Sequence, residues 1–347
     1  MLAAVLAAVV PAAIVSAAMA AAPKRACTNP DAIGLARTVV IDAAKGQVYG
    51  SVTQAPTNDI LHDKEVLLTF DDGPYPGLSR QILDTLDRHC TKATFFLVGQ
   101  MAVARPELVR EEIARGHTVG SHTWSHPMPM KALTPAAQIE EIDRGVAAVA
   151  RVAGRGLAPF FRFPGLGDSP ETLAHLKARG IATFTVDVVS NDTMIADPVK
   201  LAGHTLNILD RRGRGILLFH DIKPVTAAML PVLLAELQRR GYRVVHVVPK
   251  GPGPGLPVRP LPTAGLHQPT PPGVERFPWG LSHPGPIPTI LPLGPARAST
   301  VDPQAAARPV QAGPQALPSQ NQGPSANPGK PQPPARTWPA AVFGGVS

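Results

Sequence analysis

Between about residues 60 and 250 the chain alternates short apolar runs with segments of helical period, and this alternation constrains the fold more than any other feature. The apolar runs are Val66–Phe70, Ala93–Val98, Thr118–Gly120, Phe160–Phe163, Ala182–Val188, Gly215–Phe219 and Tyr242–Val248. The helical segments are Leu78–His89, Pro106–Arg115, Pro135–Ala153, Ser169–Arg179, Pro198–Arg211 and Val225–Arg240. Strands that alternate with helices pair in parallel through right-handed crossovers. The pattern predicts an α/β domain, either a barrel of seven strand–helix units or an open doubly wound sheet.

Polar side chains stand where several of these apolar runs end. They are Asp71 and Asp72, His122, Arg162, Asp187 and Asp192, and His220. In both architectures the functional residues gather at the carboxyl ends of the strands. The sequence therefore predicts that these side chains share one site.

Two of these polar residues, together with His126, have the chemistry of a metal site. His122 and His126 are four residues apart, so both can face one metal across a helical turn, or across a tight loop because Pro127 disfavours helix at His126. Asp72 would add a carboxylate and make an open site of two histidines and one acid. That ligand set suits zinc hydrolases and also non-haem Fe(II) oxygenases.

Taken in order, these stretches resemble the polysaccharide deacetylase family, also called the NodB-homology family or family 4 carbohydrate esterases. The resemblance covers about residues 60–250 and rests on Thr69-Phe70-Asp71-Asp72-Gly73, His122-Thr123-Trp124-Ser125-His126, Arg162-Phe163-Pro164 and Leu218-Phe219-His220-Asp221. It implies a distorted (β/α)7 barrel. It also implies that Asp71 is the catalytic base and that Asp72, His122 and His126 bind the metal.

Further roles follow from the same resemblance. Arg162 would orient the base, and His220 would be the general acid. Leu218 would line the acetate pocket, and the backbone N–H of Tyr75 would form part of the oxyanion hole.

The chain departs from the family pattern at two places. The fourth motif keeps Asp192, which supports the acid histidine, but has Thr193 where the family has a Trp that packs on the acetate methyl group. Gly165 follows Pro164 where an aromatic residue is common. These changes concern the acetyl pocket and the substrate range more than the chemistry.

The predicted function is removal of acetyl groups from N-acetylated, or O-acetylated, polysaccharide by a metal-dependent hydrolase. The expected cofactor is Zn²⁺, with Co²⁺ or another divalent metal as alternatives. A metal can polarise the carbonyl group and acidify a water molecule, while a carboxylate and a histidine move the protons. Two other classes are a catalytically idle glycan-binding homologue, which Thr193 suggests, and a non-haem Fe(II) oxygenase.

The two ends of the chain differ in composition from this region. Residues 1–22 are continuously apolar and end in small residues, as in a signal peptide or an N-terminal anchor, and either would place the protein in the periplasm, at the envelope or outside the cell. Residues 23–60 are expected to form an N-terminal arm in which Thr38–Ile41 pairs as an edge strand. Residues 61–250 form the predicted deacetylase domain.

Residues 251–347 contain 24 of the 41 prolines and predict a disordered or polyproline-II tail. The net charge of +8 includes +5 from residues 250–347, where seven basic and two acidic residues are thinly scattered. This scatter argues against nucleic acid as a partner and favours contact between the tail and an anionic envelope surface.

The chain has two cysteines, Cys27 and Cys90. In an exported protein two cysteines favour a single disulfide, and the alternative is a pair of buried free thiols. We expect the bridge to tie the N-terminal arm to the end of the first helix.

Overall fold

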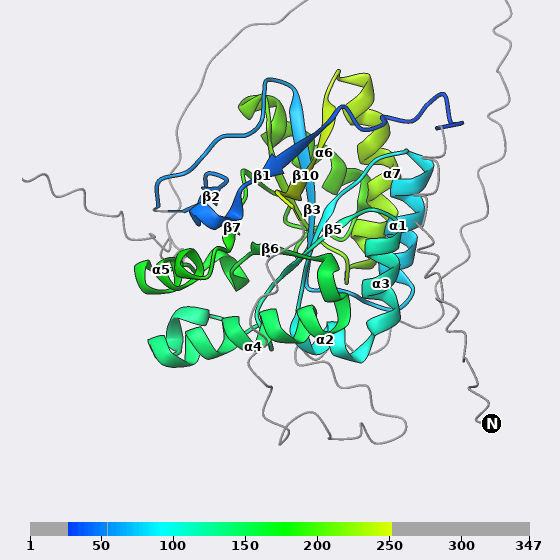
Figure 1. The fold of residues 1–347 in the computed structure, drawn as a ribbon. Helices are drawn as coiled ribbons and strands as arrows, with labels where there is room; N and C mark the ends of the chain where they lie inside the picture. Colours follow the sequence, from blue (N-terminus) through cyan, green and yellow to red (C-terminus); the bar gives the residue numbers. More distant parts are fainter. Residues whose placement is uncertain (1–26, 54, 252–347) are drawn as a thin grey trace, which may run out of the picture. The chain divides into compact units, whose positions relative to one another are not determined.

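The computed structural model describes residues 27–53 and 55–251 (Figure 1). The expected signal or anchor segment, 1–22, lies outside the described residues, as does the proline-rich tail apart from Gly251. Among the described residues, no helix is long and apolar enough to cross a membrane.

The described strands form one ten-stranded sheet, and every neighbouring pair in it is parallel. The strands are β1 (Arg37–Ile41), β2 (Val48–Tyr49), β3 (Glu65–Asp71), β4 (Thr94–Leu97), β5 (Thr118–Ser121), β6 (Leu157–Phe161), β7 (Ala182–Phe184), β8 (Val188–Val189), β9 (Gly215–His220) and β10 (Arg243–Pro249). The α-helices are α1 (Leu78–Arg88), α2 (Gly99–Ala104), α3 (Pro106–Ala114), α4 (Pro135–Ala153), α5 (Pro170–Ala178), α6 (Pro198–Arg212) and α7 (Pro224–Arg239). Short 3-10 turns lie at Ala43–Lys45, Met130–Ala132, Gly154–Gly156 and Pro164–Leu166.

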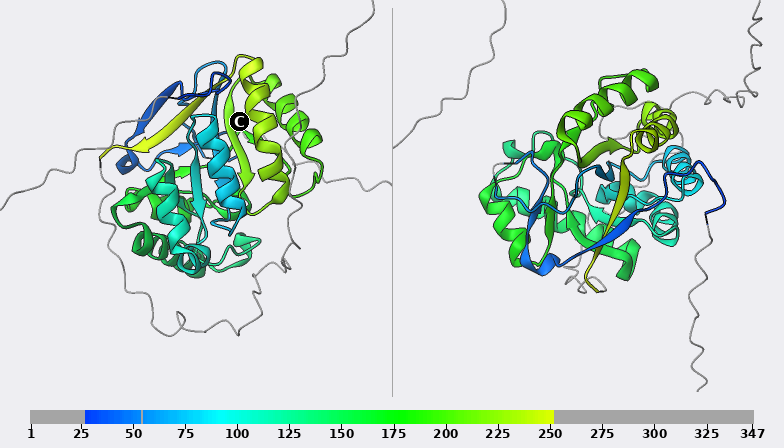
Figure 2. Two further views of the ribbon diagram at one scale, coloured as in Figure 1. Left: turned by 90° about the vertical axis from the view of Figure 1, so that its right-hand side faces the viewer. Right: turned by 90° about the horizontal axis from the view of Figure 1, so that it is seen from above.

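Strands β3 to β9 follow the course of a barrel of seven strands. The hydrogen-bonded path runs from β8 through β9 and β3 to β4, β5, β6 and β7. No ladder joins β7 to β8 in the part of the chain that the structure describes, so the ring is open there. Helices cover the outside of the strands in all three views (Figures 1 and 2). The predicted α/β class and the resemblance to a distorted seven-stranded barrel are confirmed.

The seven strands of the ring are not the seven apolar runs that the sequence predicts as strands. The run Ala182–Val188 is interrupted and supplies two strands, β7 and β8, because Thr185 and Val186 bond to the backbone of residues 49–52 instead. The last run, β10, lies outside the ring and pairs with the first half of β3, while β4 pairs with the second half. Hydrophobic periodicity cannot predict which strands pair with each other, since each strand is equally apolar.

The N-terminal arm contributes to the same sheet. The expected edge strand is present as β1, which pairs with β10, and β2 pairs with β7. Strand β2 and helix α2 were not predicted, because two and six residues are too few for a hydrophobic period to show. Side-chain caps begin two of the helices: Thr134 Oγ1 accepts a hydrogen bond from the Ala137 N–H at 3.3 Å, and Ser169 forms a capping box with Thr172.

Each strand of the ring has two buried faces, and this double burial positions the site. Alternate residues of a strand point to opposite faces. In β3, Val66, Leu68 and Phe70 belong to the larger core, which also holds side chains of the helices. Leu67 belongs to a second core inside the ring, together with Phe96, Phe160, Phe184 and Ile216. This aromatic layer fills the interior, so the residues that follow it along the strands lie at the carboxyl-end mouth.

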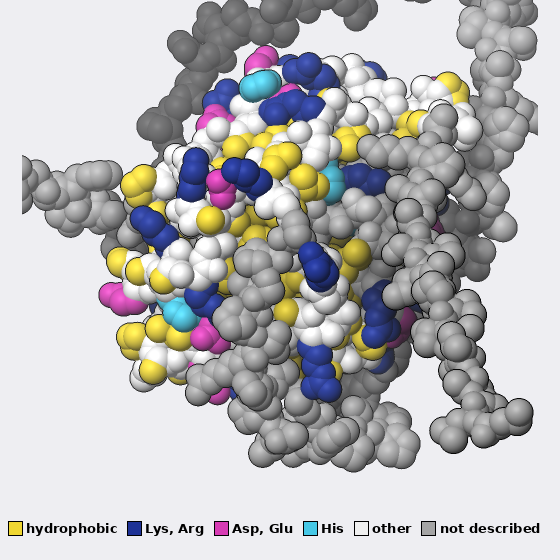
Figure 3. All heavy atoms as spheres, viewed as in Figure 1, with side chains coloured by type: hydrophobic (Ala, Val, Ile, Leu, Met, Phe, Trp, Pro, Cys, Tyr) yellow, Lys and Arg dark blue, Asp and Glu magenta, His cyan; other side chains and the backbone are white. Residues whose placement is uncertain are grey.

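Charged side chains of both signs are scattered over the face of the molecule seen in Figure 1. The space-filling view shows Lys and Arg scattered among Asp and Glu on this face (Figure 3).

The structure joins Cys27 to Cys90 by a disulfide, with the two Cα atoms 5.8 Å apart. Cys90 lies just after α1, as expected. The same contact includes a hydrogen bond from Asn29 Nδ2 to the Arg88 carbonyl oxygen at 2.8 Å.

Replacing both cysteines by serine should lower stability without changing the site. The bridge closes a sequence separation of 63 residues. Removing a link of this size is expected to reduce the free energy of unfolding by about 2–4 kcal/mol, because the unfolded chain regains its freedom. Denaturant unfolding of the oxidised protein and the double variant measures this. Equal midpoints would contradict the prediction.

Candidate active site

The two residues expected to move protons lie opposite each other on neighbouring strands. Asp71 ends β3, His220 ends β9, and the ladder between these strands pairs the two residues directly. Asp71 lies four residues after Leu67 on β3, and His220 lies four residues after Ile216 on β9. Because every second residue of a strand points to the same face, both side chains lie on the inner side of the ring. The sheet register alone thus brings together two residues 149 positions apart in sequence.

Arg162 is fully buried beneath this pair. Its Nη1 donates to Asp71 Oδ1 and to Thr69 Oγ1, each at 2.7 Å. Its other nitrogens donate to the carbonyl oxygens of Phe184 at 3.2 Å and Thr185 at 3.1 Å. The guanidinium stacks 4.3 Å from the Phe96 ring centroid, on top of the aromatic layer.

The Arg162 contact leaves one oxygen of Asp71 for chemistry. Burial raises the pKa of Asp71 to about 6, although the charges of Arg162 and His220 oppose that rise. Asp71 Oδ2 lies 3.8 Å from His122 Nε2 and lines the cavity described below. A carboxylate with this pKa can both hold and release a proton near neutral pH.

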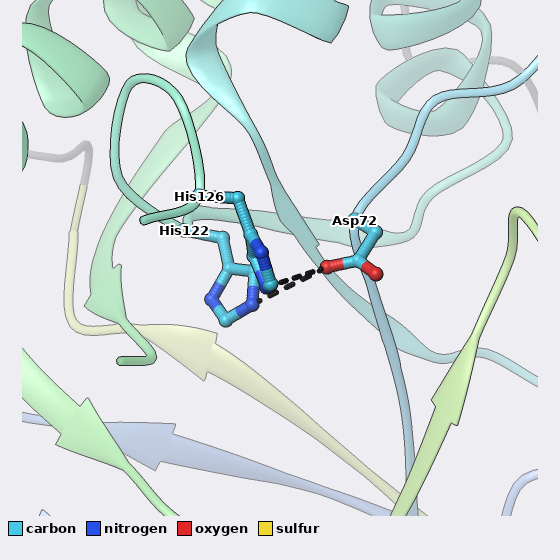
Figure 4. A group of neighbouring side chains, drawn as sticks. All are labelled: Asp72, His122 and His126. Carbon is cyan, nitrogen blue, oxygen red and sulfur yellow. Dashed lines mark ion pairs between the residues drawn. The ribbon is translucent and has the colours of Figure 1, made fainter. Parts of the chain in front are cut away.

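Asp72 points toward the two histidines, His122 and His126 (Figure 4). Its backbone has the left-handed φ of 78°, which ends the alternation of the strand and turns the side chain. Asp72 Oδ1 lies 3.2 Å from His126 Nε2 and 3.5 Å from His122 Nε2. Among the described residues, Asp72, His122 and His126 form the one group with ligand atoms all within 4.8 Å that could hold a metal ion.

The loop after β5 positions the two histidines without a helix. Thr123 and His126 both have left-handed φ angles, 66° and 56°. Glu141 of α4 fixes the loop, because its carboxylate accepts hydrogen bonds from the N–H of Ser125 at 2.9 Å and of Trp124 at 3.2 Å. Gly145 permits the close approach, since an added Cβ would lie 2.2 Å from the Thr123 carbonyl carbon. The tight-loop alternative for this pair is therefore correct.

The donor set fits a divalent cation. His122 Nδ1 donates to the Arg162 carbonyl oxygen at 2.7 Å, so the lone pair of this imidazole is on Nε2. Burial and the neighbouring His126 hold the pKa of His122 well below its usual value, which keeps the ring neutral. Asp72 Oδ1 is buried and accepts no hydrogen bond. Acceptor atoms that face one another in a buried site need a cation between them.

His220 is held by Asp192 with its second nitrogen toward the cavity. Asp192 Oδ1 accepts from His220 Nδ1 at 2.7 Å, and Asp192 Oδ2 accepts from the His220 N–H at 2.7 Å and from Thr226 Oγ1 at 2.6 Å. Burial alone would lower the pKa of His220, but the bond to Asp192 and the charges of Asp192, Asp72 and Asp71 raise it to about 9. The imidazole is therefore a cation that can donate a proton.

These side chains line a cavity of about 700 Å³ at the carboxyl ends of the strands. Leu218 and Thr193 line it, as expected for an acetyl pocket, and Thr193 is exposed. Tyr75 is not among the lining residues, and its N–H donates to Ser79 Oγ at 2.7 Å. An oxyanion role would require this N–H to leave Ser79, so we assign Tyr75 no step. Asp187, the second acid of the fourth motif, lies at the other end of β9, where it accepts the N–H of Ile216 at 2.8 Å.

Two supporting residues carry no sequence signal. Glu141 and Thr226 lie on helices, and each contacts the site only through tertiary structure. Thr69 and Asp221 belong to the motifs quoted in the sequence analysis, but the motifs do not show their contacts. Asp221 is fully buried, accepts from Ser79 Oγ at 2.5 Å and packs against Gly73, where an added Cβ would lie 2.1 Å from its Oδ2. Burial raises the pKa of Asp221 to about 7.

Fold and site together define a parallel α/β domain with a candidate metal-hydrolase centre. Residues 58–184 match the family described as "Polysaccharide deacetylase". The chain is 34% identical over 199 residues to a peptidoglycan-N-acetylglucosamine deacetylase, PgdA, of Listeria monocytogenes, a match that covers 56% of this chain and 40% of that protein. It is 30% identical over 206 residues to a chitooligosaccharide deacetylase of a Bradyrhizobium species, covering 55% of this chain and 92% of that protein.

A solved structure of a peptidoglycan deacetylase from Bdellovibrio bacteriovorus has a TM-score of 0.56 and 32% sequence identity, with 62% of this chain and 59% of that chain covered. The chain therefore belongs to the polysaccharide deacetylase family. Its match spans less than half the length of the Listeria relative.

The pKa values predict a bell-shaped pH profile for kcat/KM. Asp71 must be ionised, so activity should rise with pH through about 6, and His220 must be protonated, so activity should fall above about 9. Asp192→Asn removes the negative charge that helps to raise the pKa of His220, while its amide oxygen can still accept from Nδ1, so the alkaline limb should move to lower pH. Asp187→Asn is the matched control and should leave that limb in place. An alkaline limb that stays fixed in Asp192→Asn would contradict the assignment.

Proposed function

We propose that this protein is a metal-dependent hydrolase that removes acetyl groups from an N-acetylated polysaccharide outside the cytoplasm. One observation carries the proposal: Asp71 and His220 face each other in register, beside the group formed by Asp72, His122 and His126. The similar proteins of Listeria and Bradyrhizobium, named for peptidoglycan and chitooligosaccharide, support an acetylated glycan as the substrate class.

Asp72, His122 and His126 would hold the cation, and Zn²⁺ suits two imidazoles and one carboxylate. When bound, the cation supplies polarisation of the acetyl carbonyl group and acidification of water. Asp71, aimed by Arg162, takes the proton of the attacking water. His220, aimed by Asp192, gives a proton to the sugar nitrogen as the bond between this nitrogen and the acetyl carbon breaks. An O-acetyl ester would require the same two transfers.

Leu218 and Thr193 are proposed to contact the acetyl methyl group from the cavity wall. A Trp side chain buries about 150–250 Å² of surface, and Thr193 offers less contact to the methyl group. Thr193 thus gives this chain a wider and wetter acetyl pocket than a Trp would.

The alternatives receive less support. An Fe(II) oxygenase has no use for an Arg-held base and an Asp-held acid on either side of the ligand group, and the family match opposes it. A glycan-binding homologue without activity would not need a base with a pKa near 6 beside an acid with a pKa near 9.

Acetate release is the direct test of the proposed function. Chitooligosaccharide, peptidoglycan, an acetylated exopolysaccharide and O-acetylated xylan should be compared, with zinc or cobalt supplied. Release from at least one amide substrate, abolished by a chelator and restored by metal, is expected. No release from any of the four would overturn the proposal.

Mutation should distinguish the roles of the two neighbouring carboxylates, Asp71 and Asp72. Asp72→Asn weakens the metal site, so zinc content and activity should fall together. Asp71→Asn leaves that site intact, so zinc should stay bound while the rate falls by about 10²–10⁴, the usual share of a general base. Zinc titration and acetate release on both variants decide this. Zinc loss in Asp71→Asn, or full zinc content in Asp72→Asn, would reverse the assignment.

A further inference from the structure

Lys223 is a positive charge in the cavity for which the proposed reaction has no use. It lies three residues after His220 and immediately before α7. Among the described residues it is the one Lys or Arg that lines the cavity. Its side chain is half-buried, so part of its stem lies against protein while the ammonium group can reach solvent.

The other charged side chains of the cavity already have partners. Asp71 is bonded to Arg162, and His220 is bonded to Asp192. Asp72 is directed at the histidines of the metal group. Within the described part of the chain, the ammonium group of Lys223 has no hydrogen bond or ion pair, whereas its backbone N–H donates to the His220 carbonyl oxygen at 3.3 Å.

The position of Lys223 relates it to one part of the substrate. His220 must lie at the sugar nitrogen, because that atom receives its proton. The backbone bond between residues 223 and 220 fixes the lysine on the same turn as His220. Since Lys223 lines the same cavity as His220, its flexible side chain can reach a substituent on the ring carbon next to the reacting acetamide.

A neutral amino sugar gives a lysine nothing to neutralise. An ammonium group is strongly hydrated and loses rotamer freedom when it is held, so it contributes binding energy chiefly when it meets an anion. An ether-linked acid on the neighbouring carbon is one way for an N-acetylated sugar to carry an anion, a carboxylate, next to its acetamide.

We propose that Lys223 binds a carboxylate on the sugar being deacetylated, and that the preferred substrate is an acidic N-acetylated amino sugar of the muramic type. This inference rests on the proposed function and makes it specific. The carboxylate and the acetamide together would fix the ring in one orientation, with the nitrogen toward His220.

The test compares three matched oligosaccharides. One is neutral and contains N-acetylglucosamine, one contains N-acetylmuramic acid, and the third is the same muramic compound with its carboxylate converted to an amide. Lys223→Gln should raise KM for the acidic compound about 5–30-fold at low salt, with kcat nearly unchanged, since a charge-assisted hydrogen bond is lost. KM for the neutral and amidated compounds should change less than about twofold.

Two control variants accompany the test. Lys200→Gln removes an exposed lysine from α6, outside the cavity, and should leave all three KM values unchanged. Lys223→Arg keeps the charge and should retain most of the preference for the acidic compound. Raised salt should reduce the preference of the wild-type enzyme, because the contact is partly exposed.

The outcomes separate this inference from the proposed function. Equal losses on acidic and neutral compounds in Lys223→Gln, or wild-type release of acetate from the neutral compound alone, would overturn the role of Lys223 and leave the deacetylase intact. If the wild-type protein releases acetate from none of these compounds and from none of the four polymers, the proposed function fails. Calorimetric binding of the acidic and amidated compounds then decides the carboxylate site, and equal affinities would overturn it.

Discussion

The contact between Arg162 and Asp71 is the constraint on which the rest of the site depends. A guanidinium buried at 0% exposure has lost all of its water, and only hydrogen bonds in good geometry can offset that cost. Arg162 obtains them from Thr69 and Asp71 on β3 and from the backbone at residues 184 and 185. The same side chain therefore fixes the spacing of β3, β6 and β7 and the aim of the base. Removing one partner of such a pair typically costs about 3–5 kcal/mol, because the other charge remains buried.

The division of labour between two adjacent carboxylates follows from one backbone angle. Asp71 still obeys the alternation of β3 and points to Arg162, while Asp72, at φ 78°, has left the strand and points to the histidines. Asp tolerates this left-handed conformation better than most residues. A single chemical type can thus serve as a base and as a ligand at consecutive positions, and each carboxylate gets its properties from its surroundings.

Much of this arrangement could be predicted from the sequence, because strand alternation and strand ends are local properties. The metal group, the base–Arg pair and the His220–Asp192 pair all meet as the motifs indicated. The pairing of the strands within the sheet could not be predicted. Nothing local shows that β10 lies beside β1, or that residues 182–188 break where the backbone turns to residues 49–52. The hydrogen bond from the Tyr75 N–H to Ser79 Oγ likewise joins a turn to the helix that follows it, and hydrophobic periodicity gives no sign of such a bond.

The disulfide has a mechanical consequence for the domain. Helix α1 starts next to the cavity end of β3 and runs back along the strand, so Cys90 lies at the end of the domain away from the cavity. Cys27 is fastened there. A pulling force on the chain before Cys27 is therefore taken up by the covalent bridge and the end of α1, and the strands that hold Asp71 and His220 are shielded from the load.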